Sequence, residues 1–331
     1  MHTPTGTDKS LVFNHIQQSH SESHMFLRVL PCERAYTRPC RVPGALVEHM
    51  RHQETTLRIV TWNMNHCRRS EQQRKAAWDY LREELRADLA LVQEAVPPAG
   101  LEAVYRPVHA TDPSYQWGSA VVALGGGVKL LTRKRVPLES SHMKAVAADE
   151  LPDSHPGACA VADVLDAAGN VQLTAISLYG QWEMRPGSDN AMDATPRLHR
   201  MLSDLTGVFV KRDVPIVVAG DWNISTQGSK SADNEAAAVF ARLRAWRMAD
   251  AIAHTRGGRS KLEGCACSDA DACSHVHTYR HNNRADSSPT HFDYAFVSEL
   301  LLPKLECQVV HDEAAWALSD HAPIVIDVSL G

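Results

Sequence analysis

The sequence lacks the features that would place the protein in or across a membrane. No apolar run approaches the roughly 18 to 20 residues that span a bilayer. The N-terminus also lacks the charged segment followed by an apolar one that marks a secretory signal. We therefore expect a soluble, cytoplasmic protein without a membrane span.

Composition excludes two further classes of protein. The net charge of −5 over 331 residues gives no overall basic surface for gripping long nucleic acids, so any contact with a polyanion is expected to be local. The eight cysteines are spread too unevenly over too long a chain to form a disulfide framework, which favours reduced thiols. A hydrophobic content of 44% predicts a globular protein.

The chain changes in character near residue 55. Residues 1–54 are rich in His, Ser, Thr and Gln without a hydrophobic period, so we expect a poorly ordered extension, with Met25 or Met50 as alternative starts. We expect residues 55–331 to form one domain. It contains about nine short β-type runs bounded by turn residues, at 57–63, 89–94, 119–124, 159–165, 171–179, 215–223, 292–298, 307–312 and 323–330.

Segments with a helical period lie between these runs, near 71–87, 197–212 and 235–247. The stretch DAAGNV (166–171) predicts a hairpin turn between two strands, which favours a mixed sheet over a purely parallel one. Two stacked sheets flanked by amphipathic helices fit this pattern best. Residues 254–291 are a long polar stretch without a core period, which is typical of a functional or disordered insertion.

Several runs end in polar residues that can bind metals. These are Asn63, Glu94, Tyr179, Asp221 and Asn223, while Asp293 lies within a run and Asp320 and His321 precede the last one. Each residue alone has an ordinary explanation, because Gly-Asp-x-Asn commonly forms a turn and a terminal Glu is commonly solvated. If the strand ends meet in one cleft, however, buried carboxylates there need a cation.

Six motifs, in this order, resemble the endonuclease/exonuclease/phosphatase superfamily: TWNMN, LVQE, SLY, GDWN, DYAFVS and SDHAP, spanning about residues 57–330. This superfamily includes pancreatic deoxyribonuclease, abasic-site endonucleases, sphingomyelinases and inositol-polyphosphate phosphatases. The resemblance implies a four-layer α/β/β/α sandwich with two mixed β-sheets. It also implies hydrolysis of a phosphoester that depends on a divalent metal, Mg²⁺ or Mn²⁺.

The resemblance also assigns roles to residues of this sequence. Asn63, Glu94 and Asp320 are expected at the metal site, with Glu94 as the principal carboxylate ligand. Asp221 and Asn223 would activate the attacking water and orient the phosphate, and Tyr179 would contact the scissile phosphate. Asp293 would fix the orientation and tautomer of His321. Asn65 stands where some nucleases carry a metal-binding aspartate, so one metal site is favoured over two.

The 254–291 stretch and its neighbourhood contain further candidates. Arg280 and His281, with Arg284 as a weaker candidate, precede a strand that carries Asp293 and would overhang the cleft, where a guanidinium can pair with a phosphate. Trp182 would stack on a base or cap the cleft. Cys265, Cys267, Cys273 and His275 leave two alternatives, a structural Zn²⁺ or incidental reduced cysteines, and the irregular C-x-C-x5-C-x-H spacing favours the second.

Three functions remain open. A metal-dependent nuclease acting on DNA or RNA is the first choice. A phosphatase or phosphodiesterase of a small phosphorylated molecule or phospholipid head group is the second, favoured by the acidic charge balance. The third, an inactive binding module on the same fold, is disfavoured because all the polar strand-end residues are present. No protein partner can be inferred.

Overall fold

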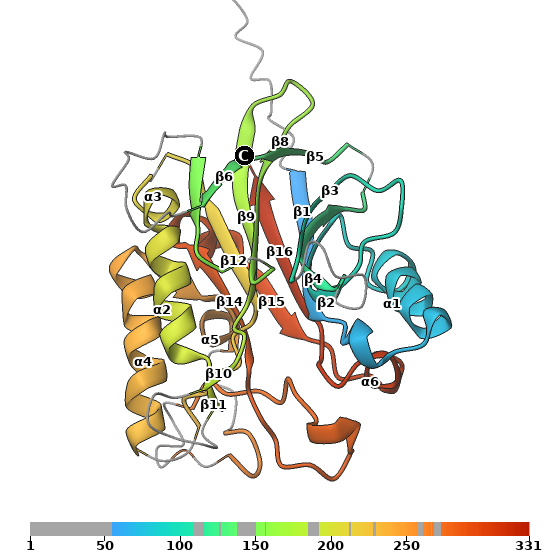
Figure 1. Ribbon diagram of the computed structural model, residues 1–331, viewed down its shortest axis with the longest axis vertical. Helices are drawn as coiled ribbons and strands as arrows, with labels where there is room; N and C mark the ends of the chain where they lie inside the picture. The colour runs from blue at the N-terminus through green and yellow to red at the C-terminus, as the bar shows by residue number, and fades with distance from the viewer. Residues whose placement is uncertain are drawn as a thin grey trace, which may run out of the picture. The chain divides into compact units, whose positions relative to one another are not determined.

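Two six-stranded β-sheets form the centre of the computed structural model (Figure 1). Residues 52–331 make one unit, and the structure describes residues 55–330 except 109–115, 126, 138–149, 156, 185–191, 212, 228–229, 257–260, 266 and 268–272. The expected extension at 1–54 lies outside the described residues. Within this described part, none of the helices has the length and apolar content needed to cross a bilayer.

The first sheet has the strand order β15-β16-β1-β2-β4-β3. Strands β1 and β2 are parallel, and the other neighbours are antiparallel. The bounds are β1 Thr55–Asn63, β2 Leu89–Ala95, β3 Ala103–Pro107, β4 Gly118–Ala123, β15 Glu306–Val309 and β16 Ile324–Leu330.

The second sheet has the strand order β13-β14-β12-β9-β8-β5, with β9 and β12 parallel and its other neighbours antiparallel. Its bounds are β5 Lys129–Thr132, β8 Cys159–Leu165, β9 Val171–Tyr179, β12 Ile216–Asp221, β13 Met248–Asp250 and β14 Asp293–Ser298. Two small sheets pair β6 (Lys134–Pro137) with β7 (Glu150–Asp153) and β10 (Glu183–Met184) with β11 (Met192–Asp193).

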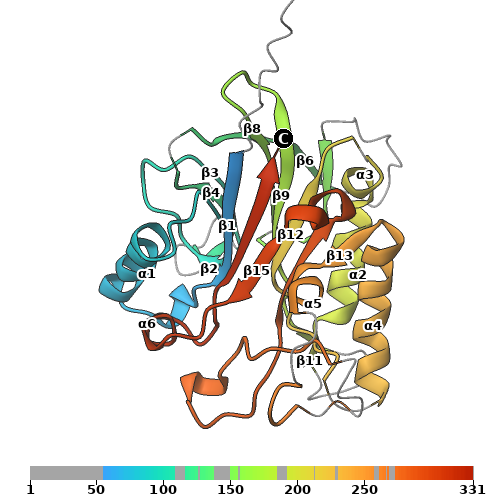
Figure 2. The same cartoon turned by 180° about the vertical axis from the view of Figure 1, so that it is seen from behind.

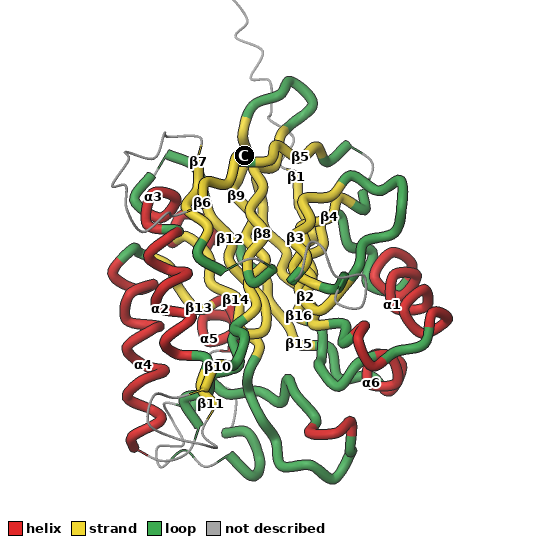
Figure 3. The backbone as a smooth tube through the Cα atoms, viewed as in Figure 1, coloured by secondary structure: helices red, strands yellow, loops and turns green. Residues whose placement is uncertain are grey.

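Helices cover the outer face of each sheet (Figure 3). Helices α1 (Glu71–Glu83) and α6 (Glu313–Leu318) pack on the first sheet. Helices α2 (Thr195–Asp204), α3 (Thr206–Phe209) and α4 (Lys230–Ala245) pack on the second. The arrangement confirms the predicted four-layer α/β/β/α sandwich, and Figure 2 shows α4 and α2 on the opposite side of the sheets from α1.

The core between the two sheets is asymmetric. The second sheet presents mostly alanines at its centre, namely Ala160, Ala162, Ala175, Ala219 and Ala295. The first sheet presents larger side chains, namely Leu57, Ile59, Leu89, Leu91 and Ile326. Helix α5 (Ala251–Arg256) and the 3-10 helix Glu299–Lys304 close this layer at the β13–β14–β15 side. Small residues facing large ones let the sheets approach closely without overpacking.

All nine strands expected from the sequence are present, and the hairpin turn after Leu165 is confirmed. There the N–H of Asp166 donates to the carbonyl of Asn170, and Gly169 has φ +88°. The three helical segments are also confirmed, although the stretch 197–212 is divided into α2 and α3 at Leu205. The sequence did not predict β3, β5, β6, β7, β10, β11 and β13, which are short.

The described part of the 254–291 segment contains more regular structure and more buried residues than the sequence predicted. Helix α5 extends to Arg256, and a 3-10 helix forms at His281–Asn283. Another 3-10 helix lies at His66–Arg68. Thr278 and His291 are almost fully buried, at 0% and 1% exposure. The segment therefore packs against the domain.

Candidate active site

The polar strand ends meet at one edge of the sandwich because of the sheet topology. The parallel pair β1 and β2 brings Asn63 and Glu94 to the same edge, and the parallel pair β9 and β12 does the same for Tyr179 and Asp221. Strands β14 and β16 run antiparallel to these pairs, so their beginnings lie at this edge. Those beginnings carry Asp293, and Asp320 with His321.

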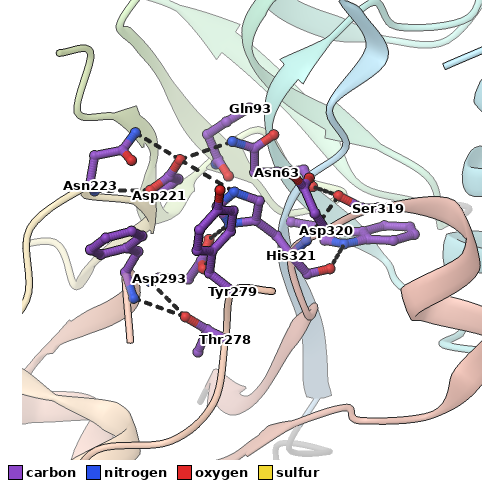
Figure 4. A network of polar contacts seen from close by, with 12 residues as sticks. Asn63, Gln93, Asp221, Asn223, Thr278, Tyr279, Asp293, Ser319, Asp320 and His321 are labelled. Atoms are coloured by element: carbon purple, nitrogen blue, oxygen red, sulfur yellow. Dashed lines mark hydrogen bonds and ion pairs between the residues drawn. The ribbon is translucent and has the colours of Figure 1, made fainter. Parts of the chain in front are cut away.

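Hydrogen bonds join the two sheets at this edge (Figure 4). The side-chain amide of Asn63 donates to Asp221 Oδ2 at 2.9 Å and to Glu94 Oε1 at 3.3 Å. The Tyr179 hydroxyl donates to the same Glu94 oxygen at 2.8 Å. Asn63 and Glu94 belong to one sheet, and Tyr179 and Asp221 to the other, so these contacts fix the relative position of the carboxylates.

His321 is held by a buried carboxylate. Its Nδ1 lies 2.9 Å and 3.1 Å from the two oxygens of Asp293, and its Nε2 lies 3.9 Å from Asp221 Oδ2. The hydroxyl of Thr278 accepts from the backbone N–H of Asp293, which anchors the backbone that carries this carboxylate. The Tyr279 ring packs against the imidazole with centroids 4.8 Å apart. The Nε2 edge of His321 is therefore directed toward Asp221.

Asp320 and Glu94 lie near a turn that follows β1. The side-chain amide of Asn65 donates to Asp320 Oδ1 at 2.7 Å, and the Cys67 thiol lies 3.3 Å from Glu94 Oε2. Among the interactions of the described residues, neither carboxylate forms an ion pair with a lysine or arginine. The hydrogen bonds described for them come from neutral donors.

The backbone adopts left-handed conformations at this edge. Glu94 has φ 48°, at a bulge where the β2–β4 register shifts, and Asn223 has φ 50°. Such conformations are costly for residues other than glycine and persist where the surroundings enforce them, often at functional sites. Gly220 has φ +153°, and a Cβ there would lie 1.9 Å from the carbonyl oxygen of Leu178. The glycine of GDWN is therefore required for close strand packing.

Burial and charge shift the ionisation of three groups. Burial, together with the negative charge of Asp293, raises the pKa of Asp221 to about 8, although His321 opposes the shift. Burial lowers the pKa of His321, but Asp293 and Asp221 outweigh it and raise the value to about 10. Burial and the charges of Glu94 and Asp221 raise the pKa of Tyr179 well above its ordinary value, so its hydroxyl stays a donor.

These residues border a cleft of about 1070 Å³. Of the residues singled out from the sequence, the structure brings ten to its wall: Asn65, Glu94, Tyr179, Trp182, Asp221, Asn223, His281, Arg284, Asp320 and His321. Asn63 and Asp293 lie just behind the wall, 1% and 2% exposed, and contact it through hydrogen bonds.

The structure places Arg280 differently from the expected phosphate contact. Its guanidinium stacks over the Trp316 ring, 4.1 Å from the centroid, and lies 3.5 Å from Glu313 Oε1. Arg280 does not line the cleft, whereas Arg284 and Arg68 do. Packing on an aromatic face of α6 turns the side chain away from the site, which sequence proximity to Asp293 does not reveal.

Sequence reasoning missed several residues of the cleft wall. Tyr279 and Phe292 contribute aromatic faces, and Trp117 lies edge-on to Tyr179 with centroids 6.1 Å apart. Cys67 and Arg68 come from the turn after β1. Both residues follow Asn63 by five positions or fewer, and the turn that contains them begins at the site. This short spacing could have predicted that they line the cleft.

Two sets of residues at this edge carry groups that can bind a metal ion. Asp221, Asp293 and His321 have ligand atoms within 4.8 Å of one another. However, both oxygens of Asp293 contact His321 Nδ1, so the hydrogen bond between these two residues already occupies their ligand atoms. Glu94 and Asp320 instead face the cleft, beside the amides of Asn63 and Asn65. Hard oxygen donors of this kind fit Mg²⁺ or Mn²⁺.

A sequence model of the Endonuclease/Exonuclease/phosphatase family matches residues 60–321. Comparison with curated proteins gives no match.

Among solved structures, the chain is similar to the AP endonuclease LMAP from Leishmania major, with TM-score 0.56 and 14% identity, covering 83% of this chain and 88% of that one. The catalytic domain of Xenopus laevis APE2 has TM-score 0.55 and 12% identity, with coverages of 83% and 93%. The endonuclease domain of TRAS1, a telomere-specific non-LTR retrotransposon, has TM-score 0.52 and 16% identity, with coverages of 82% and 98%. At these identities the similarity concerns the fold.

Proposed function

Because the chain belongs to the endonuclease/exonuclease/phosphatase family, we propose that it is a divalent-metal-dependent hydrolase of phosphodiesters that acts on a nucleic acid. The observation that carries the proposal is the convergence of Glu94, Asp221, Asp320 and the Asp293–His321 pair on one cleft. Three of these four carboxylates, all but that of Glu94, are buried, which is costly beside a single imidazole unless a cation joins them.

Asp221 is proposed as the base that accepts a proton from the attacking water. Burial raises the pKa of this carboxyl toward neutral pH, which suits the role because a general base works best when its pKa lies near the operating pH. Three donors fix its orientation: the amide of Asn63, and the backbone N–H and side-chain amide of Asn223, each at 2.9 Å. Water placed at the free edge of this carboxylate can attack a phosphorus held across the cleft.

His321 is proposed as the cationic donor to a phosphate oxygen. The charge of Asp293 raises the pKa of His321 to about 10, so the imidazole is protonated at neutral pH. Asp293 accepts the hydrogen bond from Nδ1–H, and the Nε2–H can therefore donate to the substrate. Preorganised positive charge of this kind stabilises the negative charge that develops in phosphoryl transfer. The Tyr179 hydroxyl adds a second donor on the Glu94 side of the cleft.

Glu94 and Asp320 are proposed to hold the divalent cation, assisted by the oxygens of Asn63 and Asn65. When bound, such a cation polarises the phosphoryl oxygen and offsets the charge on the leaving group. Asn65 is neutral, so the carboxylates beside it favour a single cation.

The cleft wall supports a nucleic acid as substrate. Trp117, Trp182, Tyr279 and Phe292 offer aromatic faces, and stacking of bases on such faces is worth about 1–3 kcal/mol per base. Arg68 places positive charge on the cleft wall, whereas the guanidinium of Arg284 is paired with Asp286 at 2.7 Å. The AP endonucleases among the structural neighbours suggest abasic DNA as one substrate to include in any test.

The test is a substrate panel with Mg²⁺ or Mn²⁺. Purified protein is incubated with supercoiled plasmid, duplex DNA carrying one abasic site, single-stranded DNA, RNA and bis(p-nitrophenyl) phosphate. His321→Ala serves as the inactive control. We expect cleavage of at least one nucleic acid that chelation abolishes. Hydrolysis of small phosphoesters alone would support the alternative function, and no hydrolysis of any substrate would refute the proposal.

The salt dependence of KM, measured for a matched pair of arginine variants, tests whether the cleft wall binds substrate phosphates. Arg68→Ala should flatten the dependence of KM on salt by about one phosphate contact. Arg280→Ala should leave the dependence unchanged, because its guanidinium packs on Trp316 outside the cleft. Equal effects of the two substitutions would contradict the assigned cleft wall.

A further inference from the structure

A second cluster of potential ligands lies in the 254–291 segment, away from the carboxylates. Nδ1 of His275 lies 3.6 Å from Cys265 Sγ, 3.0 Å from Cys267 Sγ and 3.6 Å from Cys273 Sγ. Cys265 and Cys273 have their sulfur atoms 3.7 Å apart. All four ligand atoms lie within 4.8 Å of one another, and the three cysteines are free thiols.

These separations match the edges of a tetrahedron around a zinc ion. With Zn–S near 2.3 Å and Zn–N near 2.0–2.1 Å, tetrahedral angles give S–S edges of about 3.8 Å and S–N edges of about 3.6 Å. Three of the four separations agree with these values, whereas Cys267 Sγ, at 3.0 Å, lies closer to the imidazole than the expected edge. Three sulfurs and one nitrogen also complete a closed four-coordinate set without an open position.

The surroundings orient the imidazole as a ligand would require. His275 Nε2 lies 2.5 Å from the Thr226 hydroxyl, so an Nε2–H donated to that oxygen leaves the Nδ1 lone pair facing the sulfurs. A hydrogen bond on the distal nitrogen is the usual partner of a metal-bound histidine.

Donors also surround the sulfurs. The side-chain amide of Gln227 lies 3.4 Å from Cys265 Sγ, and the backbone N–H of Cys267 hydrogen-bonds the same sulfur. Lys261 donates to the carbonyl of Cys267, and Arg256 to that of His275. Three thiolates around Zn²⁺ leave one net negative charge, which these two cations would offset.

We propose that Cys265, Cys267, Cys273 and His275 bind one structural Zn²⁺. Soft thiolates with one imidazole in tetrahedral array select zinc over the hard cations that suit the carboxylates of the cleft. A simple pair of cysteines would not explain why an oriented imidazole faces all three sulfurs. The spacing alone favoured incidental cysteines, because it does not specify the path of the loop that gathers them.

The zinc site would fix the segment that supports the catalytic histidine. Three residues after His275, Thr278 accepts from the backbone N–H of Asp293, and Tyr279 packs on His321. Gln227 links the cluster to the other end of the segment, since its Oε1 accepts from the N–H of His291. Metal binding would therefore hold both ends of the segment that lead into the cleft.

Metal content tests the proposal independently of hydrolytic activity. The full chain is produced with zinc in the medium, purified with a reductant and treated with EDTA to remove loosely bound cations. Mass spectrometry of elements should then find about one zinc per chain. Cys273→Ser should lower the ratio at least tenfold, whereas Cys307→Ser, which removes a buried cysteine outside the cluster, should leave it unchanged. Zinc well below one per chain in the unsubstituted protein would overturn the proposal.

A second measurement covers the case in which Cys273→Ser does not fold. The unsubstituted protein is titrated with p-hydroxymercuriphenylsulfonate in the presence of a chromogenic zinc indicator. One zinc should be released per chain as the thiols react. Replacement of zinc by Co²⁺ should add the absorption of a tetrahedral cobalt–thiolate centre. Release of no zinc, or a cobalt spectrum typical of oxygen ligands only, would contradict the site.

Discussion

Asp293→Asn is the most informative substitution in the proposed mechanism. Asp293 contacts His321 Nδ1 through both carboxylate oxygens and is 2% exposed. It is the strongest of the charges that raise the pKa of His321 to about 10 against the opposing effect of burial. The amide has nearly the same size as the carboxylate, so the substitution removes the charge while it retains the packing.

The magnitude follows from the attraction between the two charges. At an effective dielectric constant of about 20, unit charges about 4 Å apart attract by about 4 kcal/mol. This energy corresponds to about 3 pH units. The pKa of His321 should therefore fall from about 10 to near 7 in Asp293→Asn. Loss of an oriented, protonated imidazole should lower kcat/KM by about 10²–10⁴.

The same shift predicts how stability depends on pH. The folded-state pKa of His321 lies above the ordinary 6.5, so its contribution is fully present below pH 6.5 and lost as pH rises through about 10. In Asp293→Asn the loss should occur near pH 7. The free energies of unfolding of the two proteins should therefore converge between pH 7 and pH 10, as measured by urea denaturation.

NMR titration of the His321 Cε1–H signal, assigned with His321→Gln, measures the pKa directly, and the pH profile of kcat/KM follows its catalytic effect. Asp250→Asn is the matched control. It removes another enclosed carboxylate, on the neighbouring strand β13, whose pKa burial raises to about 6. It should leave the His321 signal unmoved. An unaltered titration of His321 in Asp293→Asn would refute the assigned pairing.

Three further predictions concern the cation, the glycine of GDWN and the N-terminal residues. Glu94→Gln should keep the fold and raise the Mg²⁺ concentration for half-maximal activity at least about tenfold; wild-type activity at limiting Mg²⁺ would show that Glu94 is no ligand. Gly220→Ala should lower the free energy of unfolding by about 3 kcal/mol or more, because its Cβ would overlap the Leu178 carbonyl. Gly207→Ala is the control, since an added Cβ there meets nothing within 4 Å, and equal denaturation midpoints would contradict the argument. A chain starting at Met50 should fold and hydrolyse substrate normally, because residues 52–331 form one unit; loss of the thermal transition would show otherwise.

The sequence was sufficient for the fold because hydrophobic period and turn residues carry most of that information. Alternation and short apolar runs located the nine main strands, and the stripe through Leu198 and Phe209 located α2 and α3. Edge strands such as β5 escaped prediction because their side chains are half exposed and lack a period. Lys129 and Leu131, for example, are both exposed on that strand.

The site was predictable only in part, and the reason is physical. Polar residues at strand ends are placed by topology, so Asp221 and His321 could be expected to meet. The position of a long side chain in a loop depends on its packing partner. The guanidinium of Arg280 packs on Trp316, which is distant in the sequence. The meeting of Cys265 with His275 depends in the same way on the path of a loop without a period.

The alanine-rich face of the second sheet has a consequence for catalysis. The carboxylates come from both sheets, so the layer of Ala175, Ala219 and Ala295 against Leu91 sets the distance between the two halves of the site. Ala175 lies four residues before Tyr179, about 13 Å along the strand. A larger side chain there would act as a wedge, widening the Asn63–Asp221 and Tyr179–Glu94 contacts from a remote position. The value of kcat would then depend on the distance between the two sheets. Substitutions that enlarge these alanines should therefore lower the activity before they prevent folding.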